Sequence, residues 1–261
     1  MKTVSLVKLG GSVITDKARP YTPNLPNIKK LARIVAEIHN SGHALILGTG
    51  AGSFGHYPVV KYKIGKGVKN KNQLLGFALT QSKVTILNGL VIEALIKNGV
   101  PAIPIHPSSV AIASKGKIKS FQLDTIIHAL RLGAVPVVHG DMVIDLEQGG
   151  AVISTENLFE DLAKRLPKRD VVIKRAIYIS NSSGVLDKQG RVIKNLSHKD
   201  KDVFSSVGLT RGYDVTGGMR SKLKSSFALA KRGIPVHIVG ANSRVDILKA
   251  TQGQPAGTKI S

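Results

Sequence analysis

Three glycine-rich segments, each close to a lysine, could bind phosphate groups. Their sequences are KLGGS at residues 8–12, GTGAGSFGH at residues 48–56 and TGGM at residues 216–219. Glycine lets backbone N–H groups approach an anion without a Cβ in the way, and a helix N-terminus adds the positive end of its dipole. A single such segment is weak evidence, since glycine often serves only the turn between a strand and a helix. Three of them in one chain favour a phosphate-binding protein.

The cations beside these segments are Lys8, Lys17 and Lys222. Phosphoryl transfer depends mainly on positioning and on neutralising the charge of the phosphoryl oxygens, which lysine can do. Most of the other lysines fit a solvated surface. His56 follows the second segment directly and could hold a substrate phosphate, although a lone histidine more often makes a structural hydrogen bond. None of the segments has the spacing of a P-loop or of a Rossmann fold, so any phosphates are cradled in another way.

The elements that must position these residues follow an alternating pattern of short apolar runs and longer stretches with helical periodicity. The predicted strands cover residues 4–8, 44–47, 102–105, 135–139, 176–180, 236–239 and, at a sheet edge, 258–260. The predicted helices cover residues 27–39, 74–98, 123–132, 156–166, 219–232 and 243–250. Residues 142–144 and 151–153 are expected to form a hairpin. The alternation predicts a mainly parallel sheet covered on both faces, with ligands at the carboxyl ends of its strands.

Composition narrows the class of protein. The chain has 261 residues, of which 42% are hydrophobic, and contains no cysteine. It can therefore bury a substantial core but form no disulfide or thiolate metal site. We see no apolar run long enough to cross a membrane and no signal-peptide pattern, so we expect a soluble, cytoplasmic protein without a membrane partner. The histidines lack the spacing of metal ligands, and no protein metal site is predicted.

The formal net charge of +22 would attract anions such as phosphates, nucleic acid or anionic lipid. Aromatic residues make up only 4% of the chain, so platforms for base stacking are scarce. No motif typical of nucleic-acid recognition is present. A solvated basic surface is therefore favoured, while contact with nucleic acid stays an alternative.

Five segments together resemble the isopentenyl phosphate kinases of the amino acid kinase superfamily: VKLGGSVITDK, GAGSFGHYPVVKYKIGKGV, GFALTQS, VPVVHGDMVID and DVTGGMRSKL. The resemblance extends from about residue 4 to residue 260, and the histidine after Gly-Ser-Phe-Gly is its most specific element. It implies an α/β fold, a three-layer αβα sandwich with a mainly parallel central sheet, and usually a homodimer. It also implies that ATP, with Mg²⁺, phosphorylates isopentenyl phosphate to isopentenyl diphosphate in an archaeal-type mevalonate route.

The resemblance further implies one domain over residues 1–261, with an acceptor-binding lobe at 1–155 and a nucleotide-binding lobe at 156–261. The implied catalytic residues are Lys8, Lys17, His56 and Lys222. The implied nucleotide-binding residues are Lys8, Gly10, Gly11, Ser12, Gly52, Asn181, Gly184, Gly218 and Lys222. The implied acceptor-binding residues are Ala51, Gly55, His56 and Thr155. The helix from Leu74 would supply an apolar wall from Phe77, Ala78 and Thr80.

Two segments depart from the family pattern. Ser154-Thr155-Glu156 stands where Ser-Gly-Asp is usual, so the expected aspartate is a glutamate and Thr155 adds a side chain at a position of close approach. Residues 180–184 read SNSSG where Thr-Asp-Val-Asp-Gly is usual, so two acidic residues on the nucleotide side are missing.

Three hypotheses remain open at this point. The leading one is a kinase acting on isopentenyl phosphate, and the second is a kinase acting on another alkyl phosphate or phosphonate. The third is a catalytically degenerate kinase fold that binds RNA, or a particle containing RNA, through its basic surface. The third is motivated by the charge and by the missing aspartates.

Overall fold

The computed structural model describes residues 1–200, 203 and 218–261. Eight strands form the main sheet in the order β10-β12-β11-β9-β1-β2-β6-β3. Their bounds are β1 Lys2–Leu9, β2 Leu45–Thr49, β3 Ala102–Ile105, β6 Val135–His139, β9 Val171–Ser180, β10 Asn195–Leu196, β11 Val236–Gly240 and β12 Thr258–Ile260. All neighbours are parallel except β11 and β12. The predicted mainly parallel sheet is therefore confirmed.

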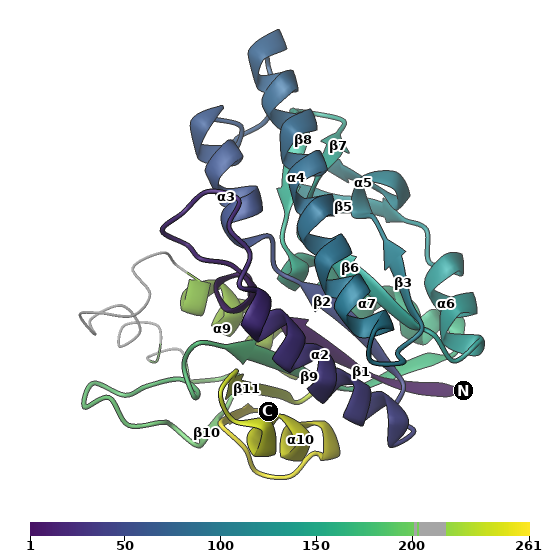
Figure 1. Ribbon diagram of the computed structural model, residues 1–261, viewed down its shortest axis with the longest axis vertical. Helices are drawn as coiled ribbons and strands as arrows, with labels where there is room; N and C mark the ends of the chain where they lie inside the picture. The colour runs from purple at the N-terminus through teal and green to yellow at the C-terminus, as the bar shows by residue number, and fades with distance from the viewer. Residues whose placement is uncertain (201–202, 204–217) are drawn as a thin grey trace.

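Helices cover both faces of this sheet, as an αβα sandwich requires (Figure 1). The helices are α1 Gly11–Ile14, α2 Leu25–Asn40, α3 Gly52–Lys61, α4 Lys71–Ile96, α5 Pro107–Val110, α6 Asp124–Arg131, α7 Thr155–Arg165, α9 Gly218–Ala230 and α10 Arg244–Gln252, with a 3-10 turn at Leu166–Arg169. One core cluster joins the sheet to α2, α4 and α10, and a second joins it to α6, α7 and α9. Successive side chains of β1 point to opposite faces of the sheet, so Leu6 belongs to one cluster and Val7 to the other.

Strand β1 lies at the centre of the sheet and positions the site. Strands β2, β6 and β3 extend from one side of it, and β9, β11, β12 and β10 extend from the other. The first group comes from residues 1–155 and the second from residues 156–261. The assignment of these two parts to acceptor and nucleotide stays a prediction. Strand β12 was expected at a sheet edge, but the two-residue strand β10 covers it.

A smaller sheet has the order β5-β4-β7-β8, with β4 Ala111–Ser114, β5 Lys117–Phe121, β7 Asp141–Asp145 and β8 Gly149–Ile153. The sequence predicted only the β7–β8 hairpin. The buried carboxylate of Asp145 joins the two hairpins, because it accepts hydrogen bonds from the backbone N–H groups of residues 115, 116, 147 and 148. In Figure 1 this sheet lies near the end of the molecule from which α4 starts.

Within the described residues, one helix, α4, is long and apolar enough to cross a membrane by length and composition alone. This corrects the expectation that no segment reaches that length. The helix packs against α2, α3, β3 and β7. Its buried residues, which include Phe77, Val84, Leu87 and Val91, therefore belong to the core of the protein.

Candidate active site

The first two glycine-rich segments meet where β1 and β2 end side by side. A Cβ at Gly11 would lie 2.5 Å from the backbone nitrogen of Gly52, and a Cβ at Gly50 would lie 2.4 Å from that of Gly11. Neither position has room for a side chain, because the two backbones are in direct contact. These glycines are thus required by the close packing of the two segments, whatever they bind.

The sequence predicts no helix in the second segment, but residues 52–56 of it are helical. Helix α3 begins at Gly52, whose φ is +50°, a value that favours glycine, and His56 lies in the second turn. The Ser53 N–H donates to Thr15 Oγ1 at 3.1 Å, and that hydroxyl donates to the Gly11 carbonyl at 2.7 Å. These two bonds fix the start of α3 against α1.

A pocket of about 230 Å³ lies beside the start of α3 and brings together the predicted acceptor-binding residues Ala51, Gly55, His56 and Thr155. Its polar lining includes the Gly50–Gly52 segment, the exposed residue His56, and the acidic residues Asp141 and Glu156. Its apolar lining comes from α3, α4, β7 and β8: Val59, Val84, Met142, Val152 and Ile153. Such a pocket suits a small molecule with an anionic head and a short hydrocarbon tail.

A second cleft, of about 530 Å³, gathers the predicted residues Ser12, Lys17 and Asn181. The Asn181 side-chain amide donates to the Ser12 carbonyl at 3.0 Å, which ties the end of β9 to α1. Thr15 also lines this cleft, and its hydroxyl binds the residue after Gly52 of the first pocket. The two hollows therefore lie on either side of the α1–α3 junction.

The strongest electrostatic feature of the site is a buried ion pair. Lys8 Nζ at the end of β1 lies 2.9 Å from Glu156 Oε1 at the start of α7, and their side chains are only 6% and 11% exposed. Burial alone would raise the pKa of Glu156, but the ion pair with Lys8 and the charge of Lys222 lower it below its ordinary value. Lys222 itself is buried, on α9. Strand β1 and helices α7 and α9 thus bring two predicted lysines to one carboxylate.

Thr155, the added side chain of the first departure, is turned toward β2. Its hydroxyl donates to the Thr49 carbonyl at 2.7 Å, and a Cβ at Gly48 would lie only 2.4 Å from its methyl group. The side chain is almost fully buried. Gly48 therefore provides the space that Thr155 needs.

Some predicted residues line neither hollow. The Gly10 N–H donates to the Ile179 carbonyl at 3.0 Å, and Gly184 packs against Thr258 and Val192. Gly218 is the first residue of α9, and its neighbour Gly217 falls outside the described residues. Of the predicted apolar wall, Thr80 lines the pocket, Phe77 packs behind it against Met142, and Ala78 is exposed. The expectation that Ala78 forms part of the apolar wall was therefore wrong, because this residue is exposed and does not line the pocket.

Comparison with known proteins identifies the family. The model of the amino acid kinase family matches residues 3–240. The chain belongs to the amino acid kinase family. Isopentenyl phosphate kinases of Methanothermobacter thermautotrophicus and Methanocaldococcus jannaschii are 35% and 32% identical to it, each over 98% of both chains. A crystal structure of an isopentenyl phosphate kinase superposes with a TM-score of 0.80 at 31% identity, covering 99% of this chain and 100% of the other.

One polar cluster of this amino acid kinase was missed by the sequence analysis. Asp141 lines the first pocket, and burial raises its pKa although the N–H groups of Ser108 and Met142 donate to it at 3.0 and 2.8 Å. Nearby, His106 Nδ1 and His139 Nε2 lie 3.0 Å apart. Burial lowers the pKa of His139 to about 4, so this imidazole is neutral near pH 7. The available signal was polar residues at the ends of two predicted strands, with His106 directly after 102–105, and with His139 and Asp141 at and just after the end of 135–139.

Proposed function

We propose that this amino acid kinase transfers the γ-phosphoryl group of ATP to isopentenyl phosphate, giving ADP and isopentenyl diphosphate. The observation that supports the proposal is the lining of the first pocket, which combines glycine backbone and a histidine with aliphatic side chains. Relatives that match nearly the whole chain are named for this activity. Nothing in these relatives supports the RNA-binding alternative.

In the proposed reaction, an oxygen of the acceptor phosphate attacks the γ-phosphorus, and the bond to the β–γ bridging oxygen breaks. The attacking oxygen is already ionised near neutral pH, so no carboxylate base is needed. Lys8, Lys17 and Lys222 would neutralise the charge that shifts from the γ-phosphate to the leaving ADP. Glu156 would hold Lys8 in place through their ion pair, and His56 would bind the acceptor phosphate.

Mg²⁺ is expected to arrive with the nucleotide rather than to reside in the protein. Within the described residues, no group of three His, Asp or Glu side chains is placed to hold a metal ion. Mg²⁺ commonly binds through substrate phosphates and water, where it neutralises phosphate charge. The charged groups that this chain itself offers to the phosphates are the three lysines.

The test is ADP release by the purified protein with ATP, Mg²⁺ and isopentenyl phosphate, beside the variant H56A. We expect turnover that requires the acceptor and falls at least tenfold in H56A. His128, an exposed histidine on α6, gives the matched control H128A, which should keep full activity. Full activity in H56A would refute the assigned role of His56. No turnover in a folded wild-type protein would refute the acceptor, and a panel of alkyl phosphates and phosphonates would then be tried.

The remaining expectations stay predictions: the homodimer, the cytoplasmic location, contact with nucleic acid and the nucleotide role of residues 10, 184 and 218. Analytical ultracentrifugation at micromolar concentration measures the first directly. A single species of 27.8 kDa would contradict it.

A further inference from the structure

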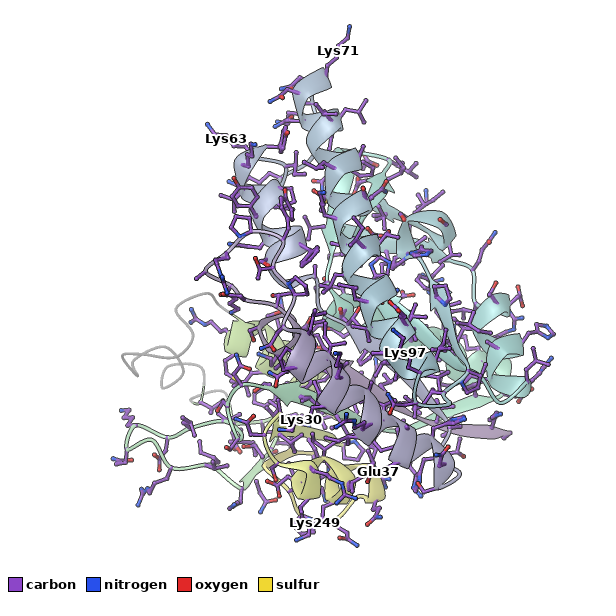
Figure 2. All side chains as sticks on the ribbon, in the orientation of Figure 1. Lys30, Glu37, Lys63, Lys71, Lys97 and Lys249 are labelled. Atoms are coloured by element: carbon purple, nitrogen blue, oxygen red, sulfur yellow. The ribbon has the colours of Figure 1, made fainter. Side chains whose placement is uncertain are left out.

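One end of the molecule carries lysines at an unusual density. Three segments form it, and we call them together the basic tip. They are residues 60–75, from the end of α3 to the start of α4, residues 115–119 of the β4–β5 hairpin, and residues 146–148 of the β7–β8 turn. Figure 2 shows Lys63 and Lys71 pointing outward at this end. Its exposed lysines are Lys61, Lys63, Lys66, Lys69, Lys71, Lys115, Lys117 and Lys119.

The three segments are held together as one surface. The Val68 N–H donates to the Gln148 carbonyl at 2.8 Å, which joins the first segment to the third. Asp145 accepts from the N–H groups of Lys115 and Gly116, which joins the second to the third. The lysines are therefore displayed by a bonded scaffold.

The charge of the tip is left uncompensated by its own residues. Glu147 is the one exposed carboxylate in the three segments. The neighbouring Asp145 is buried and already accepts hydrogen bonds from four N–H groups. Among the ion pairs between described residues, none includes a lysine of the tip. The surface thus presents a concentrated positive field, which calls for an anionic partner.

Exposed aliphatic side chains lie among these lysines. Val60, Leu74 and Leu75 are 60%, 55% and 61% exposed, and Leu146 of the third segment is also exposed. Surfaces that bind an anionic bilayer commonly combine lysines with exposed aliphatic side chains. The aliphatic side chains enter the boundary of the headgroup region, and the lysines contact lipid phosphates. A second copy of the chain would bring like charges together. The one aromatic residue of the tip, Tyr62, is half-buried against Gly76 with the Lys61 ammonium over its ring, so it leaves little room for base stacking with RNA.

We propose that the basic tip docks onto a phospholipid bilayer that carries anionic headgroups. The inference sets aside the expectation of no membrane partner, which concerned segments that span a bilayer; docking from the surface needs none. It goes beyond the kinase activity and does not depend on it.

The test is co-sedimentation of the full chain with vesicles of phosphatidylcholine alone and of phosphatidylcholine with 30% phosphatidylglycerol. The variant K63Q/K66Q/K69Q/K71Q removes four charges from the tip. Its control, K29Q/K30Q/K231Q/K249Q, removes four charges elsewhere, and Figure 2 shows Lys30 and Lys249 far from the tip. Since each lysine near an anionic surface contributes about fivefold, we expect about a hundredfold or greater loss of binding in the tip variant and a small loss in the control.

A second pair of variants tests the aliphatic contribution. L74Q/L75Q should weaken binding to the anionic vesicles about tenfold or more, while L132Q/V245Q, at exposed apolar positions outside the tip, should leave it unchanged. Kinase activity in solution should be the same for all four variants.

Two results would overturn the proposal. The first is equal vesicle binding by the tip variant and its charge control. The second is tight binding of single-stranded RNA that the tip lysines control, with L74Q/L75Q indistinguishable from wild type on vesicles; the tip would then be a nucleic-acid surface.

Discussion

Replacing Glu156 with glutamine should leave the ammonium group of Lys8 buried without its counter-ion. The two side chains form a 2.9 Å ion pair and are only 6% and 11% exposed, so little water can take the place of the lost carboxylate. Breaking a buried pair by removing one partner costs about 3–5 kcal/mol of unfolding free energy. The glutamine oxygen can still accept a hydrogen bond from Lys8, so we expect about 3 kcal/mol for E156Q.

A double-mutant cycle separates the pair from its surroundings. K8M alone and E156Q alone each leave one charge of this pair buried, whereas K8M/E156Q leaves neither charge of the pair; Lys222 is the same in all the variants. We expect the double variant to be about 2–3 kcal/mol more stable than the sum of the single losses predicts, measured by urea unfolding at pH 7. The exposed pair of Arg244 and Glu37 is the control, and its cycle should give a coupling energy below about 1 kcal/mol.

The same pair predicts an acid dependence of stability. Because the pKa of Glu156 is lower in the folded chain than its ordinary value, the ion pair stabilises the protein above that ordinary value. This contribution is lost as the pH falls through the lower, folded pKa. Wild type should therefore lose more stability than K8M/E156Q as the pH falls below about 4.5. Additive single losses at pH 7, or identical acid dependence of the two proteins, would refute the reasoning.

Two further predictions concern residues that shape the site without lining its reactive end. D145N should cost about 1–3 kcal/mol, because an amide offers one acceptor oxygen to four backbone donors. Burial opposes ionisation of Asp145, but those donors hold its pKa below the ordinary value, so the difference from wild type should shrink in urea unfolding below about pH 4. G48A should cost about 1–3 kcal/mol, because its Cβ would lie 2.4 Å from the Thr155 methyl group and 2.7 Å from the Phe159 ring. Adding T155G should recover part of that loss, and no recovery would show that Thr155 is not the obstacle.

Strands β3, β6 and β12 were predicted with both ends correct. In β3 and β6, isoleucine or valine recurs and turn residues bound the run. Strand β9 begins at Val171 rather than at residue 176, since Lys174 and Arg175 interrupt its apolar run. Arg175 is nevertheless buried, where it donates to the Thr251 carbonyl. Such a strand depends on a contact that no local pattern reveals.

Helix α3 was missed for a different reason. Gly52, Gly55 and Pro58 all have low helix propensity, so the segment reads as a loop. Tertiary packing supports the helix: a Cβ at Gly55 would lie 3.4 Å from Val84 of α4, and it would also lie 2.6 Å from the Cβ of Ala51, the residue before α3. The glycine that weakens the helix locally thus lets it approach its neighbour. The histidine could be found from the sequence, whereas the turn of helix that presents it could not.

The two departures from the family pattern have different consequences in three dimensions. The changes in the first segment are accommodated by neighbouring residues, since Gly48 leaves space for Thr155 and Lys8 pairs with the longer Glu156. Neither relation is visible locally, because the partners are more than a hundred residues apart. In the second segment, the amide nitrogen of Asn181 donates to the Ser12 carbonyl, so Asn181 joins the end of β9 to α1 at the larger cleft. Its amide oxygen carries no formal charge, so an anion in this cleft, which holds the predicted nucleotide-binding residues Ser12 and Asn181, meets less repulsion than an aspartate would cause. The loss of acidic residues at this segment is therefore compatible with the proposed binding of a nucleotide.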